Sequence, residues 1–516
     1  MNDASKLLKN TLLLAASTII LRLCALFFQA YLAARVGAEQ LGIFGIISSV
    51  GVVFATVAIS GVRFSVTRLV AEEDSTGNSC PRSLMRCAYT YAAIFGGGSG
   101  IVMYLGAGAL SHYWVMNSAA ATAIRVMALS MPLIALGSVA EGYFTAKQKV
   151  LRLVLSQFIA QVLRIGFVAG CFSCLKSFSV INVLAAGMLV SEGVLALALL
   201  GLYAAELSGK KENKPQKHNF IRLGKTALPL AISAYMRTGL SSLGQIIIPH
   251  GLRKSGMGSS SAFSTYGVIS QMSMPVIMFP AALLGALGEI LVPRLTDAQV
   301  SGRKIGISYI VNRALRLGVI FSFGVSGAML FYAQMLGRTI YNSIEAGLYI
   351  AIFAPLIPIV YIDCVTDGCL KGLNQQVHAM VYNVLEGIIN VVLLFILLPR
   401  TAIMGYIAVM YIKEIFNAVL SLRRLSKVTS IDFKTWGMLG SIISVWGAQV
   451  FGKIVFPASP LWITLAGYSL FYVALLYVVS AVSRDDIKWI LSLICVGSKN
   501  NSKKPVISVD KKALQR

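Results

Sequence analysis

Long apolar runs alternate with short polar connections along the whole chain. A transmembrane helix needs about 20 apolar residues to cross a hydrocarbon layer of about 30 Å, and about fourteen windows of the chain reach that length. These windows are residues 11–34, 41–70, 84–110, 119–146, 153–175, 181–205, 226–249, 263–290, 307–336, 347–370, 378–398, 402–420, 436–456 and 461–482. We therefore predict an all-α polytopic membrane protein with about 14 transmembrane helices.

The most polar connection, residues 206–225, separates six predicted helices from eight. Because six is even, a second lobe that starts there crosses the bilayer in the same direction as the first, which is the arrangement of parallel repeats. A weak similarity between residues 131–144 and 354–370 supports this division, with chance similarity between apolar helices as the alternative. We predict two six-helix lobes around a central cavity, an additional C-terminal helix pair and a basic tail, with the boundaries 1–215, 216–420, 421–482 and 483–516.

Composition and charge support a membrane location. Of the 516 residues, 57% are hydrophobic and only 13% are charged, whereas about 25% of the residues in a soluble protein are charged. The formal net charge is +25, but most Lys and Arg residues lie in alternate connections, as the positive-inside rule requires, and no nucleic-acid-binding motif accompanies them. We predict a multi-pass protein of the cell membrane with both termini in the cytoplasm and no nucleic acid partner.

Motifs for cofactors and catalysis are missing from the sequence. The eight cysteines are scattered, and the CxxC formed by Cys171 and Cys174 ends an apolar helix without the βαβ context of a redox motif. There is no phosphate-binding loop with its lysine, no zinc motif and no nucleophile elbow. We therefore expect no metal, no cofactor and no enzyme activity.

Charged and amide side chains inside the predicted spans follow helical spacing. An ionisable group near the middle of a bilayer costs about 2.5–3.5 kcal/mol, so these groups have to face the protein interior. Residues four or seven apart share a face of a helix, and the stripes formed in this way are Arg22 with Gln29; Thr56, Ser60, Arg63 and Thr67; Gln157, Gln161 and Arg164; Ser233, Arg237 and Ser241; and Asn383, Glu386 and Asn390. The stripes are wider than one ion pair requires, and we interpret them as walls of a water-filled cavity.

The arginines of these stripes suit an anionic substrate. A guanidinium group binds phosphate oxygens bidentately, so a cationic chamber fits a pyrophosphate headgroup better than a cationic drug. The candidate substrate-binding residues are Arg22, Arg63, Arg164, Arg237, Gln29, Gln157 and Gln161. The alternative for Arg22, Arg164 and Arg237 is pairing with acids across the bundle, whereas Arg63 is close enough to the cytoplasmic end of its span to reach the membrane surface.

Three carboxylates form a second group of candidates. Asp363 and Asp367 are one helical turn apart, and Glu386 follows in the next predicted helix. Buried neighbouring carboxylates favour the binding of a proton or a cation, so we predict that these residues bind a coupling ion. The alternative is that they balance the charge of nearby arginines.

Several functions remain open from these residues alone. A lipid-linked saccharide flippase fits the arginine-rich chamber, whereas a cation-coupled multidrug antiporter would need acids and aromatic residues there. An integral-membrane glycan ligase or polymerase is an alternative from another class, and it would leave a covalently altered product. A scaffold for envelope assembly that transports nothing is a further alternative, against which the buried charges argue.

Four segments of the chain resemble one family of membrane proteins. They are LAARVGAEQLGIFG from Leu32, AISGVRFSVTRLVAEE from Ala58, EGYFTAKQKVLRLVLSQFIAQVLR from Glu141 and LKGLNQQVHAMVYNVLEGIINVVLLFILLPR from Leu370. In this order they resemble the stage V sporulation protein B group of polysaccharide flippases, within the multidrug/oligosaccharidyl-lipid/polysaccharide exporter superfamily.

The resemblance implies a fold of two six-helix bundles with an added helix pair, working by alternating access. It implies an undecaprenyl-pyrophosphate-linked saccharide as substrate, a precursor of peptidoglycan or another envelope polysaccharide, in the manner of the related lipid II flippases. Basic residues of the first, second and seventh or eighth helices face the cavity in those relatives, and by position Arg22 and Arg237 match best here. The implied partners are this lipid-linked saccharide, membrane lipids and enzymes of envelope synthesis.

Overall fold

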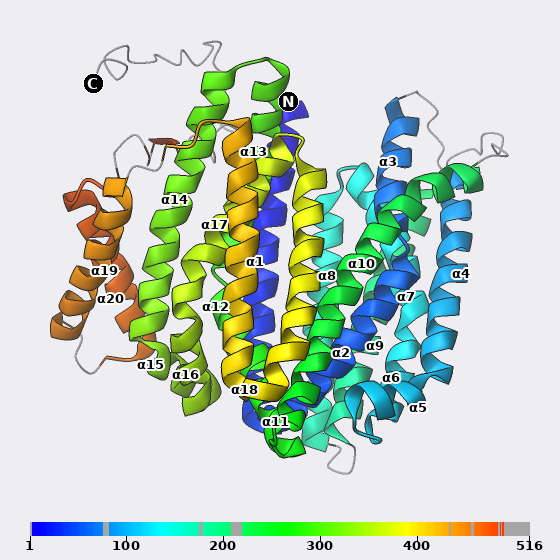
Figure 1. Ribbon diagram of the computed structural model, residues 1–516. Coiled ribbons are helices and arrows are strands. Elements are labelled where there is room, and N and C mark those ends of the chain that lie inside the picture. Colours follow the sequence, from blue (N-terminus) through cyan, green and yellow to red (C-terminus); the bar gives the residue numbers. More distant parts are fainter. Residues whose placement is uncertain are drawn as a thin grey trace.

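The computed structural model describes residues 3–75, 82–174, 179–207, 219–432, 435–455, 459–482, 486 and 488–489. Every element in these ranges is helical, and the long helices run side by side as one bundle (Figure 1). Most of the predicted polar connection, residues 208–218, and most of the predicted basic tail lie outside the described residues. The all-α fold class is confirmed.

The first half of the chain contains nine α-helices and one short π-helix within the described residues. These elements are α1 (Asp3–Val36), α2 (Ala38–Ile59), α3 (Val62–Ser75), α4 (Arg82–Leu105), α5 (Ala107–Ala109), the π-helix η1 (Leu110–Val115), α6 (Ala120–Ala128), α7 (Ser130–Ala146), α8 (Val150–Cys174) and α9 (Val180–Leu207). We call the end of the bundle at which α1 begins the N-terminal face and the other end the opposite face.

The second half begins with one long helix and then alternates long helices with short irregular ones. The elements are α10 (Asn219–Lys254), α11 (Ser259–Gly267), the π-helix η2 (Val268–Ser273), α12 (Met274–Met278), α13 (Ala281–Val300), α14 (Lys304–Phe331), α15 (Ala333–Tyr341), α16 (Ile344–Phe353), the 3-10 helix η3 (Ala354–Leu356), α17 (Ile357–Gly372), α18 (Gln376–Val428), α19 (Thr435–Val455) and α20 (Leu461–Val478).

The number of membrane crossings agrees with the sequence prediction. Ten described helices or helix pairs are long and apolar enough to cross a membrane, and two more are bent pairs, α4 with α5–η1 by 56° and α11–α12 with α13 by 50°. The 36-residue α10 is also long enough, although it is less apolar. The 53-residue α18 contains two crossings, because Ala402 has non-helical backbone angles and Lys413 and Asn417 bond back to Glu386 and Asn383.

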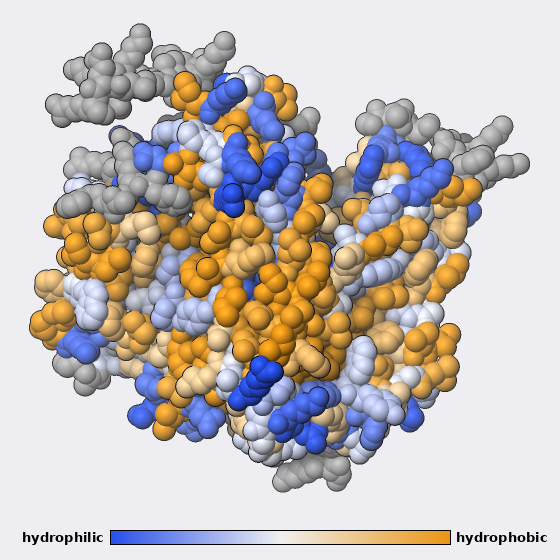
Figure 2. Space-filling view, viewed as in Figure 1, coloured by the Kyte–Doolittle hydropathy of each residue, from blue (hydrophilic) through white to orange (hydrophobic). Residues whose placement is uncertain are grey.

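The outer surface is that of a membrane protein. Figure 2 shows apolar side chains around the middle of the bundle and polar side chains at its two ends. Large hydrophobic residues such as Phe395, Trp446 and Leu470 are exposed on this surface. Contact with water would oppose such exposure, whereas contact with lipid chains favours it. The chain is therefore a multi-pass membrane protein.

Equivalent helices of the two halves pack in the same way. Thr67 of α3 contacts the carbonyl oxygen of Gly142 in α7 through its hydroxyl, at 3.1 Å, and Thr296 of α13 contacts that of Gly372 in α17, at 3.0 Å. Gly142 also packs tightly on α3, as Gly368 of α17 packs on Gly288 of α13. In each half, the second and fourth crossings are thus joined by a threonine and a close glycine contact.

The two halves meet tightly near the opposite face, at the crossing of α2 and α11. A Cβ atom at Gly42 would lie 2.1 Å from the carbonyl oxygen of Phe263, and one at Gly267 would lie 2.0 Å from that of Ala38. Ser260 also donates a 2.6 Å hydrogen bond to Glu39. At the N-terminal face, by contrast, Figure 2 shows a hollow between the part with α3 and the part with α13 and α18.

One predicted helix is broken. The sequence predicts a continuous helix over residues 41–70, but α2 ends at Ile59 and α3 begins at Val62, with positive φ angles of 43° at Ser60 and 72° at Gly61. Gly61 tolerates this backbone and lets α10 approach, since a Cβ atom there would lie 2.4 Å from the carbonyl oxygen of Ala227. The hydroxyl of Ser60 bonds that of Tyr235 in α10 at 2.7 Å. The break therefore separates Arg63 from the predicted stripe on α2.

Candidate functional site

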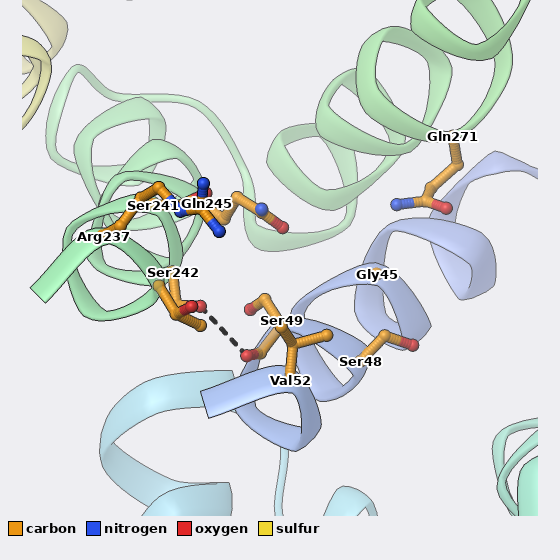
Figure 3. Close-up of a pocket in the computed structure, with 10 residues that line it drawn as sticks. Gly45, Ser48, Ser49, Val52, Arg237, Ser241, Ser242, Gln245 and Gln271 are labelled. Carbon is orange, nitrogen blue, oxygen red and sulfur yellow. Dashed lines mark hydrogen bonds between the residues drawn. The ribbon is translucent and has the colours of Figure 1, made fainter. Parts of the chain in front are cut away.

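A pocket lies between the two halves of the bundle. Its volume is about 370 Å³, and it opens between α2, α10 and the π-helix η2 (Figure 3). Its lining residues are Gly45, Ser48, Ser49, Val52, Arg237, Thr238, Ser241, Ser242, Gln245 and Gln271. Eight of these ten residues have hydroxyl, amide or guanidinium side chains, the single ionic group is a guanidinium, and neither a carboxylate nor an aromatic ring is among the lining residues.

Arg237 stands near the middle of α10, and its neighbours follow it toward the opposite face. Ser241 and Gln245 are one and two turns further along the same face of this helix. The guanidinium of Arg237 has no ion pair and no hydrogen bond within the described part of the chain. Figure 3 shows Arg237, Ser241 and Gln245 together on one wall. The stripe predicted on this helix therefore lines the pocket with Arg237 and Ser241.

Gln271 forms the facing wall, and Gln29 of α1 holds it in place. The side-chain nitrogen of Gln29 donates a 2.8 Å hydrogen bond to the side-chain oxygen of Gln271. Gln271 lies in the π-helix η2, a kind of element that is frequent at functional sites. Gly45 of α2 makes room for its amide, since a Cβ atom at Gly45 would lie 2.5 Å from the amide nitrogen. Gln245 and Gln271 point toward one another across the pocket (Figure 3).

Arg22 lies on α1 closer to the N-terminal face than Gln29. The two residues are seven positions apart, which is two turns and about 10 Å along the helix. Arg22 is exposed. It has no ion pair or hydrogen bond within the described residues. Arg22 and Arg237 are thus two unpaired guanidinium groups near the middle of the bundle, where α1 and α10 each contact both halves.

Arg63 and Gln157 belong to a separate cluster in the first half. Arg63 forms a 3.0 Å ion pair with Glu141 of α7, and Gln157 of α8 donates a 3.2 Å hydrogen bond to the same carboxylate. The side chain of Arg63 is still 41% exposed, whereas that of Glu141 is 11% exposed. Arg63 is thus paired with an acid, an arrangement that the sequence analysis did not predict for this residue.

Arg164 packs against its surroundings on α8. Its guanidinium lies over the ring of Phe28, 5.5 Å from the ring centre, and its charge interacts with Glu192 of α9. Its buried Nε atom has no hydrogen-bond acceptor within the described residues. Gln161 is on the same helix, one turn from Gln157, and is half-buried. The structure therefore does not bring Arg63, Arg164, Gln157 or Gln161 into the pocket that contains Arg237.

The predicted coupling carboxylates come together in the second half. Asn417 of α18 donates hydrogen bonds to Asp363, at 2.9 Å, and to Asn383, at 3.2 Å. Ser421 and Asn383 lie beside Asp363 and Asp367, yet the buried Oδ1 atom of each aspartate accepts no hydrogen bond within the described residues. The two carboxylates therefore have unused acceptor atoms in a buried place.

Glu386 is engaged differently from the two aspartates. Lys413 of α18 donates to Glu386 at 2.9 Å and to Glu414 at 2.6 Å, and all three side chains are at most 19% exposed. Within the described residues, no group of three or more His, Cys, Asp or Glu side chains is arranged to hold a metal ion. The sequence did not single out Lys413, Glu414 or Asn417 as a cluster, although all three are polar residues inside an apolar span.

Most of the pocket lining was not predicted. Ser48, Ser49, Thr238, Ser242, Gln245 and Gln271 line it in addition to Arg237 and Ser241. Gln245 and Gln271 carried a usable signal, because amides inside apolar spans are as unfavourable toward lipid as other polar groups. The serines carried little signal, because a serine hydroxyl can bond its own helix backbone, as Ser49 does with the carbonyl oxygen of Ile46.

Residues 7–299, more than half of the chain, match the family described as "Polysaccharide biosynthesis protein". The chain belongs to the polysaccharide biosynthesis protein family. Two proteins of Bacillus subtilis (strain 168) are similar over most of this member's length. Stage V sporulation protein B is 24% identical over 504 residues, 93% of this chain and 97% of that protein. The lipid II flippase MurJ is 21% identical over 432 residues, 76% of this chain and 77% of that protein. The resemblance drawn from the four sequence segments is confirmed.

Solved structures share the fold of this family member. A lipid II flippase MurJ in an inward closed conformation superposes with a TM-score of 0.71 at 14% identity, over 92% of this chain and all of that chain. An inward-facing multidrug resistance MATE family transporter superposes with a TM-score of 0.62 at 13% identity, over 80% of this chain and 95% of that chain. At these identities the likeness concerns the fold, a polytopic bundle of α-helices.

Proposed function

We propose that the protein is a flippase that moves an undecaprenyl-pyrophosphate-linked saccharide across the cytoplasmic membrane by alternating access. The substrate would be a precursor of peptidoglycan or of another envelope polysaccharide, and the names of the sequence relatives agree with this class. The observation that carries the proposal is the pocket between the halves, with unpaired Arg237 and a wall of hydroxyl and amide groups. Membrane lipids and enzymes of envelope synthesis would be its partners.

Arg22 and Arg237 are the residues that we propose to bind the pyrophosphate. An unpaired guanidinium inside a membrane protein is unfavourable unless water or an anion satisfies it. A pyrophosphate can accept two hydrogen bonds from each guanidinium, and such charge-assisted bonds are the strong ones. Both guanidiniums lack a protein partner within the described residues, so binding would not require an existing ion pair to break.

Arg63, Arg164, Gln157 and Gln161 remain in the proposal as a second group of contacts. Arg63 would reach the headgroup with the part of its side chain that is exposed, while Glu141 partly neutralises its charge. Because an ion pair of this kind already compensates the guanidinium, we expect a smaller contribution from Arg63 than from Arg237. Arg164 lies over the ring of Phe28 and would act mainly through its charge.

The positions of the hollow and of the tight crossing support a proposed direction of loading. We propose that the N-terminal face is cytoplasmic, because the connections at this face carry most Lys and Arg residues. Both termini would then be cytoplasmic. The hollow at this face (Figure 2) would admit the headgroup, while the crossing at Gly42 and Gly267 closes the other side. Residues 1–215 and 216–420 would rock against each other, and residues 421–482 would contact the lipid tail.

We propose that Asp363 and Asp367 bind the coupling ion, either a proton or a metal cation. Their unused buried acceptor atoms are the support for this assignment, because a buried acceptor without a donor is unfavourable by about 1–3 kcal/mol. Glu386, predicted with them, would act through its bond to Lys413. Lys413 would thereby hold the two halves of the α18 hairpin together next to the ion.

The alternatives differ in what they require of the pocket. A multidrug antiporter for cationic drugs needs carboxylates or aromatic rings, and the ten lining residues contain neither. A glycan ligase or polymerase would release a covalently altered saccharide, whereas a flippase returns the same molecule on the other side. Mass analysis of the lipid-linked saccharide after transport separates these two functions.

The arginine assignment is tested in vesicles that contain the purified protein and a fluorescent undecaprenyl-pyrophosphate saccharide. We expect Arg22→Ala and Arg237→Ala each to slow translocation at least tenfold, with partial recovery in Arg237→Lys, which keeps the charge but loses the bidentate geometry. Arg338→Ala is the matched control, because Arg338 is exposed on α15, away from the pocket. Translocation at wild-type rate in both alanine variants would refute the assignment.

A further inference from the structure

Charge is distributed unevenly along the axis of the site. The two unpaired guanidiniums, of Arg22 and Arg237, are near the middle of α1 and α10. Going toward the opposite face, the next polar groups are neutral: Ser241 and Gln245 on α10, and Gln29 with its partner Gln271. A headgroup that enters from the N-terminal face therefore meets cationic groups first and uncharged groups beyond them.

The uncharged end offers several groups that are free to bind a ligand. The hydroxyls of Ser48 and Ser241 have no partner within the described residues. The side-chain oxygen of Gln245 accepts a 3.3 Å bond from Tyr266, which leaves its NH₂ group free to donate into the pocket. Gln271 uses its oxygen for Gln29, and its NH₂ group donates one long bond of 3.4 Å to the hydroxyl of Ser270 and has a second hydrogen left for the same space (Figure 3).

These groups match the chemistry of sugar hydroxyls. A hydroxyl both donates and accepts, and an amide NH₂ donates twice, so together they can satisfy the alternating donors and acceptors of a sugar ring. They cannot compensate a buried carboxylate, whose desolvation without a cationic partner is unfavourable. The volume of about 370 Å³ lies near the lower limit of small-molecule sites, about 300 Å³, which suits a short saccharide.

We infer that the part of the pocket formed by Ser48, Ser241, Gln245 and Gln271 is a subsite for an uncharged mono- or disaccharide, with the pyrophosphate next to Arg22 and Arg237. This inference rests on the proposed function and adds the class of sugar. The substrate is a short neutral repeat unit, neither a finished polymer nor a unit with a uronic acid next to the pyrophosphate. The sugar enters first, and the lipid tail stays on the side of the N-terminal face.

Binding of three soluble analogues to the full-length protein in detergent tests the subsite. Each analogue has a short polyprenyl pyrophosphate, capped by a methyl group, by a neutral disaccharide or by the same disaccharide with one uronic acid. The methyl cap keeps the charge of the pyrophosphate diester constant. We expect wild-type protein to bind the neutral disaccharide about tenfold more tightly than the methyl-capped analogue, and the uronic acid analogue no more tightly than the methyl-capped one.

A double variant, Ser241→Ala with Gln245→Leu, separates the sugar from the pyrophosphate. We expect it to lose the preference for the disaccharide while it still binds the methyl-capped analogue like the wild type. Ser469→Ala on α20 is the control, since the Ser469 hydroxyl bonds only its own helix, at the carbonyl oxygen of Leu465. A wild-type protein without preference for the neutral disaccharide, or a double variant that keeps the preference, would overturn the subsite.

The same binding experiment tests the proposed function separately from the sugar subsite. If Arg237→Ala leaves the binding of all three analogues unchanged, the pyrophosphate site is wrong and the subsite is wrong with it. If Arg237→Ala weakens all three while the sugar contributes nothing in the wild type, the flippase proposal survives and the neutral sugar subsite does not.

Discussion

The side chains of Gln29 and Gln271 are joined by a 2.8 Å hydrogen bond across 242 residues of sequence. Gln29 belongs to the first helix of the chain, and Gln271 belongs to a π-helix in the second half. The bond fixes the orientation of an amide that faces the free guanidinium of Arg237 across the pocket. It therefore connects the two halves of the bundle at the site where we place the substrate.

We expect the Gln29–Gln271 bond to contribute about 0.5–1.5 kcal/mol to stability, the usual net value for such a bond. Gln29→Leu should slow translocation because Gln271 loses the bond that orients its amide. Gln271→Leu should slow translocation because it removes this amide from the pocket wall. A double-mutant cycle of thermal unfolding and translocation measures the coupling between them. Strictly additive effects of the two substitutions would show that the bond has no role.

The crossing of α2 and α11 should control access from the opposite face. Gly42→Ala places a Cβ atom 2.1 Å from the carbonyl oxygen of Phe263, so the two helices have to separate. We expect a cysteine introduced by Ser260→Cys to react several-fold faster with a membrane-impermeant maleimide in this background. Gly97→Ala is the control, because nothing lies within 4 Å of a Cβ atom there. Equal reactivity in both backgrounds would contradict the closing role of the crossing.

The break between α2 and α3 should be sensitive to any side chain at position 61. Gly61→Ala incurs both the strain of a positive φ angle, about 1–2 kcal/mol, and the overlap with Ala227 of α10. Gly37→Ala is a matched control, because Gly37 has a φ of 82° with nothing within 4 Å of its Cβ position. We expect a clearly larger loss of thermal stability for Gly61→Ala. Equal losses would mean that the approach of α10 is unimportant.

The buried cluster around Lys413 should depend on its charge balance. Lys413→Met leaves Glu386 and Glu414 without their cation, and removal of one partner of a buried ion pair destabilises a protein by about 3–5 kcal/mol. We expect the combination of Lys413→Met with Glu386→Gln to recover part of this loss. Thermal unfolding of the purified variants measures both effects. A double variant less stable than Lys413→Met alone would contradict this explanation.

The sequence predicted the helices well because a membrane imposes a minimum length of apolar residues on each of them. It placed the hairpin between residues 398 and 402, where Ala402 indeed has non-helical backbone angles. It failed at Ser60 and Gly61, where apolar residues continue on both sides of the break and only the approach of α10 explains the backbone. Tertiary contacts of this kind are absent from any local pattern.

The site was predicted in part, for reasons that its residues make clear. Arg237 lines the pocket and Gln29 contacts it through Gln271, because regular helices α1 and α10 keep the faces that the spacing predicted. Arg63 comes directly after the helix break at Ser60 and Gly61 and pairs with Glu141. The prediction that it shares a helix face with Thr56 was therefore wrong. Gln271 was missed although an amide inside an apolar span is itself a signal, because no predicted stripe of charged residues includes it.

Reconstitution of the wild-type protein tests the central claim most directly. Vesicles are loaded on their inner leaflet with a labelled undecaprenyl-pyrophosphate disaccharide, and the fraction accessible to an external sugar-oxidising reagent is followed with time, with and without a membrane potential. We predict that accessibility rises with the protein and that the recovered lipid-linked disaccharide is chemically unchanged. Accessibility that stays at the level of protein-free vesicles under both conditions would contradict a flippase.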